Sequence, residues 1–114
     1  MTNEAESQIQ TAILEYLTKR GHLAWRNNNQ PTYDQRMNGG HGGYRAQSKW
    51  TPKGLPDILL IDKENYGQLV GLEVKRPKGG KVSADQLLMQ KRFRLYNAEY
   101  HVVHGVEGVK QLGL

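Results

Sequence analysis

Apolar residues recur along the chain with two different periods, and these periods predict which segments are helices and which are strands. The first period is helical, because five apolar residues follow the spacing i, i+3, i+4, i+7, i+8 of one helix face: Ile9, Ala12, Ile13, Tyr16 and Leu17. Thr2 or Asn3 can cap the start of this helix, and Lys19-Arg20-Gly21 fits its end. The sequence therefore predicts an amphipathic first helix.

The middle of the chain carries two short apolar runs that predict a β-hairpin. Residues 58–61 are long enough for a buried strand and too short for a helix, and residues 69–76 form a second strand candidate. The segment 63–67 between them is polar and ends in glycine, as hairpin loops do. Folding the chain about the middle of this loop pairs Asp57 with Glu73.

This pairing sets two carboxylates opposite each other, where their repulsion destabilises a sheet unless a cation lies between them. The period of two also puts Lys75 on the same face as Glu73, while three apolar residues share the other face: Val70, Leu72 and Val74. The resulting pattern, Asp57 after proline and then Glu73-Val74-Lys75, can hold a divalent cation and activate a water against a phosphodiester. The alternative is an ordinary Glu-Lys pair on an exposed sheet face.

The rest of the chain predicts a strand over 22–27, a helix and a last strand. Ser83 and Gln86 have capping-box spacing for a helix that runs to about Tyr96. Asn97 fits a left-handed helix stop, residues 100–104 fit a strand, and residues 106–112 fit a short closing helix. We interpret His101 and His104, which flank the apolar residues of the last strand, as structural.

Residues 27–53 differ in kind, because no periodic element is visible in them, and a structureless segment of that length is unusual in a small domain. We expect residues 28–53 to form a flexible loop or arm. The segment interleaves basic with aromatic residues, which suits contact with phosphates and exposed bases: Tyr33, Arg36, Tyr44, Arg45, Lys49, Trp50 and Lys53. The alternatives are a low-complexity insertion or an arm that crosses to a second subunit.

Size and charge restrict the class of protein. A chain of 114 residues is expected to form one domain, 1–114. The formal net charge of +5, from 16 Lys and Arg against 11 Asp and Glu, favours a polyanionic partner. The absence of cysteine excludes disulfides and thiolate zinc sites. No apolar run reaches membrane-spanning length and no secretory-type N-terminus is visible, so we expect a cytoplasmic protein without a membrane partner.

Taken together, the motifs resemble the VRR-NUC family of the PD-(D/E)XK nuclease superfamily. The resemblance covers nearly the whole chain apart from residues 28–50, and it is closest to the stand-alone members found in phages and bacteria. The segments that carry it are Glu6-Ser7-Gln8-Ile9-Gln10, Trp25-Arg26-Asn27, Gly54-Leu55-Pro56-Asp57-Ile58, Leu72-Glu73-Val74-Lys75-Arg76-Pro77, Gly80-Lys81-Val82-Ser83 with Gln86, and Asn97-Ala98-Glu99-Tyr100-His101-Val102-Val103.

The resemblance implies an α/β fold with a restriction-endonuclease-like core, in the order αβββαβ, with a mixed sheet flanked by helices. It also implies a Mg²⁺- or Mn²⁺-dependent endonuclease in which Asp57, Glu73 and the Val74 carbonyl hold the metal. Glu6 is either a further ligand or part of a helix cap with Asn3. Lys75 either orients the attacking water or stabilises charge on the phosphate, and Gln86 caps its helix, orients the water, or does both.

The implied substrate is branched DNA such as a four-way junction. The candidate DNA-binding cations are Arg26, Arg36, Arg45, Lys49, Lys53, Arg76, Lys78 and Lys81. A junction must be cut on two strands while one small domain offers one site, so we expect a homodimer. The alternatives are a non-catalytic nucleic-acid-binding module, a flap- or nick-directed nuclease, and a restriction-type nuclease. A non-catalytic module would be expected to lose Asp57, Glu73 or Lys75, and all three are present.

Overall fold

The computed structural model describes residues 4–27, 33–45 and 49–114. The two residues proposed to cap the first helix, Thr2 and Asn3, lie outside these ranges. In chain order the elements are α1 (Glu4–Lys19), β1 (Leu23–Arg26), β2 (Tyr33–Asp34), the short helical turn α2 (Met37–Gly40), β3 (Gly43–Tyr44), β4 (Ile58–Asp62), a 3₁₀ turn (Lys63–Asn65), β5 (Gln68–Val74), α3 (Ala84–Leu95), β6 (Glu99–Val103) and α4 (Val106–Gln111).

The main sheet has four strands in the order β1-β4-β5-β6. The pairs β1–β4 and β4–β5 are antiparallel, and β6 is parallel to β5, so the sheet is mixed as predicted. Within β4–β5, Asp62 pairs with Gln68 and Ile58 with Leu72, which is the register predicted from the loop. Asp57, directly before β4, therefore lies opposite Glu73. The second strand ends at Val74 rather than at residue 76.

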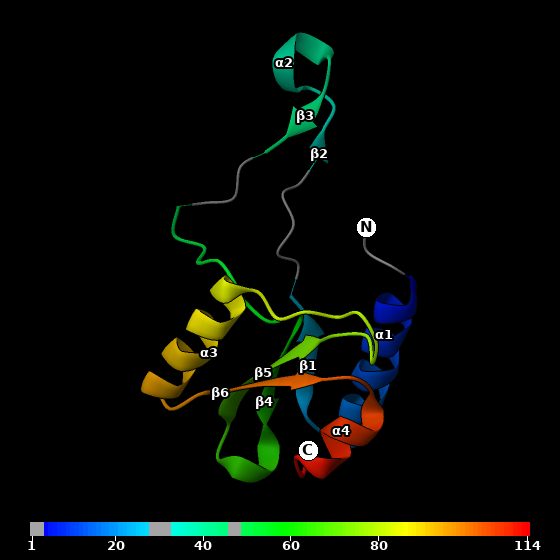
Figure 1. Cartoon of the computed structure of the whole chain (residues 1–114), viewed down its shortest axis with the longest axis vertical. Coiled ribbons are helices and arrows are strands. Elements are labelled where there is room, and N and C mark those ends of the chain that lie inside the picture. The colour runs from blue at the N-terminus through cyan, green and yellow to red at the C-terminus, as the bar shows by residue number, and fades with distance from the viewer. Residues whose placement is uncertain (1–3, 28–32, 46–48) are drawn as a thin grey trace.

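One face of the sheet carries the hydrophobic core. Side chains of β4 and β5 pack there against α1 and α4, and the fully buried members are Ile13, Leu17, Ile58, Leu60, Val70, Leu72, Val74 and Val109. Figure 1 shows α1 and α4 together at one side of the sheet, with α3 at the other. Ala12, which we assigned to the buried stripe of the first helix, is exposed, because Ile13 and Leu17 occupy the centre of that stripe.

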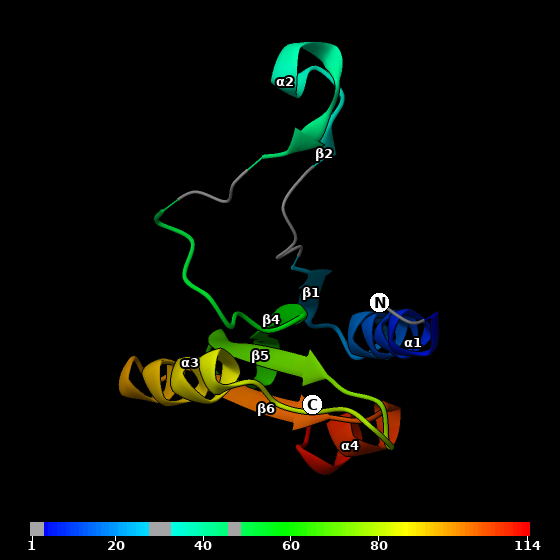
Figure 2. The same cartoon turned by 45° about the horizontal axis from the view of Figure 1, so that its top comes forward.

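The opposite face of the sheet is covered only in part. Figure 2 shows α3 lying over β5 and β6, where a Cβ added at Gly71 would be 3.1 Å from the ring of Phe93. Over β1 and β4 this face is open, and we call its exposed apolar residues the open sheet face. They are Leu23 (65% exposed), Trp25 (40%), Ile61 (36%) and Leu69 (38%). Strand alternation also places Glu73 and Lys75 on this face, at the opposite end of β5 from Leu69.

In the second half of the chain, the observed elements match those predicted from the sequence. Ser83 and Gln86 form the predicted capping box, and α3 ends where Asn97 adopts a positive φ of 62°. The last strand and the closing helix begin and end within one residue of the predicted ranges. Over the described residues, the structure contains no helix with the length and apolar character needed to cross a membrane.

Within residues 28–53, where we expected a flexible loop or arm, residues 33–45 contain short elements that no period in the sequence indicates. In this segment β2 and β3 pair as a two-stranded ribbon, with Tyr33 opposite Tyr44 and Asp34 opposite Gly43, and α2 closes the turn between them. We call residues 33–45 the hairpin arm, and Figure 1 shows it standing apart from the main sheet. Parts of the predicted loop, residues 28–32 and 46–48, lie outside the described ranges.

Candidate functional site

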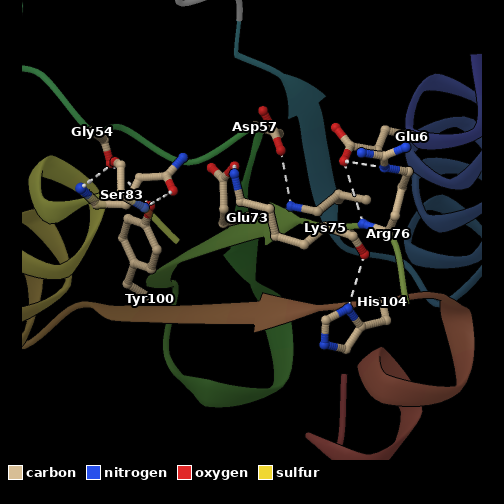
Figure 3. A network of polar contacts seen from close by, with 11 residues as sticks. Glu6, Gly54, Asp57, Glu73, Lys75, Arg76, Ser83, Tyr100 and His104 are labelled. Carbon is tan, nitrogen blue, oxygen red and sulfur yellow. Dashed lines mark hydrogen bonds and ion pairs between the residues drawn. The ribbon is translucent and has the colours of Figure 1, made fainter. Parts of the chain in front are cut away.

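The end of the sheet where β4 begins and β5 ends brings three of the predicted residues together. Figure 3 shows Asp57, Glu73 and Lys75 side by side, with Glu6 and Arg76 towards α1. The Asp57 carbonyl accepts a hydrogen bond from the backbone N–H of Asn27 (2.7 Å), on the β1 side. Its carboxylate oxygen Oδ2 accepts a second one from the backbone N–H of Val74 (2.9 Å). Asp57 is therefore held in place from both neighbouring strands.

The turn before Asp57 is packed tightly against the start of α3. Gly54 has a φ of +83°, and a Cβ there would lie 2.3 Å from the carbonyl oxygen of Asp85, so only glycine fits. The Tyr100 hydroxyl donates a hydrogen bond to the Gly54 carbonyl (2.9 Å), and Pro56 is fully buried. Strand β6 and helix α3 thus fix the turn that delivers Asp57 to the site.

Glu73 is the most deeply buried acid of the site, at 3% exposed. Its oxygen Oε2 is 3.2 Å from Nζ of Lys75. Its other oxygen, Oε1, is buried and finds no hydrogen-bond partner in the described part of the chain. A buried carboxylate oxygen without a donor is costly unless a cation or another donor satisfies it.

The electrostatics of the two acids agree with this incomplete pairing. Burial raises the pKa of Glu73, the nearby charge of Asp57 also raises it, and Lys75 opposes both effects, so that the pKa is about 7. Burial also raises the pKa of Asp57, against the lowering effect of the Val74 N–H. One lysine therefore does not compensate the two carboxylates. A hard divalent cation, which prefers oxygen ligands, fits this pair.

No third acidic or imidazole ligand completes the pair: within the described ranges, no three His, Cys, Asp or Glu side chains are grouped so that they could share a metal ion. Glu6, predicted to be a further ligand or part of a helix cap, borders the site from α1. Its Oε2 accepts a hydrogen bond from the backbone N–H of Arg76 (3.3 Å) and lies 3.8 Å from Nε of the same residue. A cation held by Asp57 and Glu73 would take its remaining ligands from backbone oxygens, water or substrate.

Gln86 acts as a helix cap in this structure. Its Oε1 accepts a hydrogen bond from the backbone N–H of Ser83 (2.9 Å), while its own backbone N–H donates to Ser83 Oγ (3.1 Å). The capping role predicted from the spacing is confirmed. One turn later, Gln90 donates through Nε2 to the Tyr100 carbonyl (3.0 Å), which ties α3 to β6 beside the site.

The predicted DNA-binding cations separate into three groups. Arg76, Lys78 and Lys81 are exposed on the segment that follows β5. Arg26 instead contacts α1, where it donates through Nη2 to Thr11 Oγ1 (3.1 Å). The remaining four lie in or near the hairpin arm: Arg36 and Arg45, which bind Asp34; Lys49, whose Nζ is 5.2 Å from the centroid of the Trp50 ring; and Lys53, which is exposed just before the Gly54 turn.

The sequence did not predict the roles of two residues, Tyr100 beside the acidic pair and Asp34 in the hairpin arm. Tyr100 pairs with Gly71 in the sheet, and this register puts its ring on the face that carries Glu73. Burial raises the pKa of Tyr100 above its usual range, and the charges of Glu73 and Asp57 add to the rise, so its hydroxyl stays protonated as a donor. Asp34 organises the hairpin arm. Neither role has a local motif that reveals it.

Comparisons with known proteins address the fold. No family model matches the chain, and no curated protein matches it. A solved structure described as a VRR_NUC domain superposes with a TM-score of 0.65, covering 96% of this chain and 95% of that one at 24% sequence identity. The mixed α/β architecture predicted from the resemblance is confirmed. This chain has the fold of a VRR_NUC domain over nearly its whole length.

Proposed function

We propose that this protein is a metal-dependent DNA endonuclease that hydrolyses phosphodiester bonds, with branched DNA such as four-way junctions as its preferred substrate. The observation that carries the proposal is the Asp57–Glu73 pair, in which the described residues supply no donor to one buried carboxylate oxygen and one lysine faces two acids. The VRR_NUC fold supports the proposal independently of that geometry.

Asp57 and Glu73 are the side chains that would hold the metal, together with the Val74 carbonyl. The N–H of Val74 points at Asp57, and the N–H and C=O of one strand residue point to the same side, so this carbonyl is directed towards the same space. When bound, Mg²⁺ or Mn²⁺ supplies a Lewis acid for the phosphate and lowers the pKa of a bound water.

Lys75 is the residue proposed to act on the reacting groups. Its ammonium lies 3.2 Å from Glu73 Oε2 on the same sheet face, and its side chain is only 17% exposed. From there it can orient the attacking water or stabilise the charge that develops on the phosphate. The Oε1 atom of Gln86 accepts the hydrogen bond from the Ser83 backbone N–H. We therefore assign the orientation of that water to its amide nitrogen Nε2.

The substrate class follows from charge. The net charge of +5 favours a polyanion, and Arg76, Lys78 and Lys81 continue directly from the proposed catalytic strand. We assign these three cations to the DNA backbone that leads to the scissile phosphate.

The test is cleavage of matched DNA substrates: linear duplex, splayed, flap and four-way. We expect cutting with Mg²⁺ or Mn²⁺, fastest on branched DNA, and none in excess EDTA. Asp57→Ala should abolish cutting, whereas Glu64→Gln, which removes an exposed carboxylate on the 3₁₀ turn, should leave the rate unchanged. Full activity in EDTA would overturn the metal assignment. Metal-independent DNA binding with no cleavage of any substrate would favour the non-catalytic module.

We also propose that two copies pair through the open sheet face. Four exposed apolar side chains lie there, and burying them against a second copy removes this apolar surface from water. The charged residues of the same sheet face, Glu73 and Lys75, lie at the other end of β5. A twofold pair supplies two sites for the two cuts that a junction needs. A single cut would need only a monomer, as in a flap- or nick-directed enzyme.

Light scattering tests the pairing, free and on junction DNA. We expect a dimer mass for the wild type and a monomer mass for Trp25→Glu. Leu112→Glu is the matched control, since Leu112 is 38% exposed, against 40% for Trp25, but follows α4, which packs on the core side of the sheet. A monomer mass of the wild type both free and on DNA would overturn the dimer.

A further inference from the structure

The hairpin arm is held together by its own side chains, and Asp34 is at the centre. Asp34 Oδ1 accepts a hydrogen bond from the backbone N–H of Arg36 (2.9 Å), and Oδ2 accepts one from Nε of Arg45 (2.8 Å). Nη2 of Arg45 lies 2.6 Å from the same oxygen. On the far side of the turn, Asn38 Nδ2 donates to the Gly42 carbonyl (2.9 Å). The arm is therefore an ordered unit of 13 residues rather than a random loop.

The arm presents a pair of aromatic rings. Tyr33 and Tyr44 lie opposite each other on the ribbon and meet edge to face, with centroids 5.2 Å apart. The ring of Tyr33 also packs against the turn, because a Cβ at Gly42 would lie 2.9 Å from its Cζ. Tyr33 is 52% exposed and Tyr44 is 69% exposed. The turn thus fixes Tyr33, and Tyr33 in turn holds the more exposed ring of Tyr44.

The same unit presents two cations that are oriented but still accessible. Asp34 holds both guanidinium groups, yet the side chains of Arg36 and Arg45 remain 88% and 60% exposed. A guanidinium has five N–H donors, so the bonds to Asp34 leave several for a second acceptor. Strand alternation puts Asp34 on the ribbon face opposite the rings, and the ribbon is only two strands wide, so a bound chain can reach both faces.

Exposed rings beside oriented cations are the chemistry that binds single-stranded nucleic acid. Bases stack on aromatic faces whatever their sequence, and cations bind the phosphates between them. A protein partner would instead be expected to cover a larger apolar surface than two ring faces. Figures 1 and 2 both show the arm standing clear of α3 and β1, in agreement with the exposure of both rings.

We propose that the hairpin arm is a second nucleic-acid site that takes the unpaired bases of a DNA branch. Tyr44 stacks on an exposed base, Arg36 and Arg45 bind the flanking phosphates, and Asp34 fixes the spacing of the two arginines. The proposal rests on the proposed function for its substrate, because unpaired bases occur where a branched DNA opens. The hairpin arm would thus recognise the branch, and the Asp57–Glu73 site would cut it.

Binding by the Asp57→Ala protein in EDTA tests the site without any cleavage. The probes are a single-stranded oligonucleotide with one 2-aminopurine and the same sequence as a full duplex. We expect the single strand to bind with quenching of 2-aminopurine. Tyr44→Leu should weaken single-strand binding about tenfold and abolish the quench, with little effect on the duplex. Tyr44→Phe should retain both, and Tyr66→Leu, which removes a fully exposed tyrosine outside the arm, should change nothing.

Substitution of an arginine should change the salt dependence of binding, which substitution of Tyr44 should not. Arg45→Gln should weaken binding of both probes and reduce the slope of log affinity against log salt by about 0.7 on the single strand. Unchanged single-strand affinity and quenching in Tyr44→Leu would overturn the proposal. A fall from dimer to monomer mass in Tyr44→Leu with unchanged affinity would do the same, and would assign the arm to a subunit contact. Both readouts are independent of cutting, so the absence of metal-dependent cleavage in the wild type would contradict the proposed function alone.

Discussion

Two carboxylates of this protein, Asp34 in the hairpin arm and Glu73 in the sheet, each face a cation and yet have opposite properties. Both oxygens of Asp34 are bonded, and hydrogen bonds from the Arg36 backbone and the Arg45 guanidinium lower the pKa of this carboxyl. Glu73 has one bonded oxygen and one bare one, and burial beside Asp57 raises its pKa to about 7. The difference lies in the supply of donors. The arm supplies donors to both oxygens of Asp34, whereas the described residues around Glu73 supply a donor to only one of its oxygens.

The largest expected effect is on the cleavage rate, which should fall for a change in the sheet site and not for a change in the hairpin arm. Lys75→Ala should lower the single-turnover cleavage rate by about 10²- to 10³-fold while DNA binding is retained, because Lys75 is assigned to the reacting groups. Removing charge at Lys78 and Lys81 should do the reverse, with weaker DNA binding and a flatter salt dependence. In the arm, Asp34→Asn should leave the rate on a bound linear duplex near that of the wild type. Wild-type cutting by Lys75→Ala would show that its assigned role is wrong.

The pH dependence of stability should differ in sign between the two acids. In the unfolded chain Glu73 loses its proton near its ordinary pKa of 4.5, but in the fold it keeps that proton up to about pH 7. Without metal, the free energy of unfolding should therefore fall as pH rises from about 4.5 to 7, by at most about 3 kcal/mol, and then level off. The raised pKa of Asp57 acts in the same direction.

Urea unfolding in EDTA between pH 5 and pH 8 measures this effect. Glu73→Gln should flatten the decline. The lowered pKa of Asp34 contributes stability that is present at neutral pH and is lost only as pH falls below its ordinary value of 3.8, so Asp34→Asn should keep the decline. If the wild type and Glu73→Gln showed the same decline, the burial and charge argument for Glu73 would fail.

Added metal should stabilise the fold through Asp57 and Glu73 and should have no such effect through Asp34. Because Asp57 and Glu73 are proposed to hold the metal, Mg²⁺ or Mn²⁺ should stabilise the fold, by about 2.7 kcal/mol at 100 times the dissociation constant. Asp57→Ala should lose this gain, and Asp34→Asn should keep it. Thermal unfolding followed by circular dichroism, with and without EDTA, measures the difference. An equal metal-induced rise in Asp57→Ala would contradict the assigned ligands.

The sequence predicted the relative placement of Asp57, Glu73 and Lys75 because the determinants of that placement are local. A short loop sets the register of β4 and β5, and strand alternation then places Asp57, Glu73 and Lys75 without any knowledge of the other strands. The hairpin arm was missed because its stability comes from one acid that bonds residues 36 and 45, a link that no period or motif reveals. Tyr100 was missed because only the order of strands in the sheet brings it near Glu73.

The smallest effect concerns the support of Asp57 rather than its charge. Tyr100→Phe keeps the edge-to-face contact with Phe93, whose ring centroid is 5.4 Å away, but removes the hydrogen bond to the Gly54 carbonyl. The loss should cost about 1 kcal/mol of stability. It should also loosen the turn that delivers Asp57, and so lower the cleavage rate a few-fold and raise the metal concentration needed for half-maximal cutting.

Tyr16→Phe is the matched control for this last change. The Tyr16 hydroxyl donates a comparable hydrogen bond, to the Leu114 carbonyl (3.1 Å), on the core side of the sheet and away from the site. Both variants should lose similar stability in urea, and only Tyr100→Phe should change the cleavage rate and its metal dependence. Equal cleavage rates of the two variants would show that the Tyr100 hydroxyl contributes only to stability. A difference would show that the turn before Asp57 contributes to cleavage through the hydrogen bond from Tyr100 to Gly54.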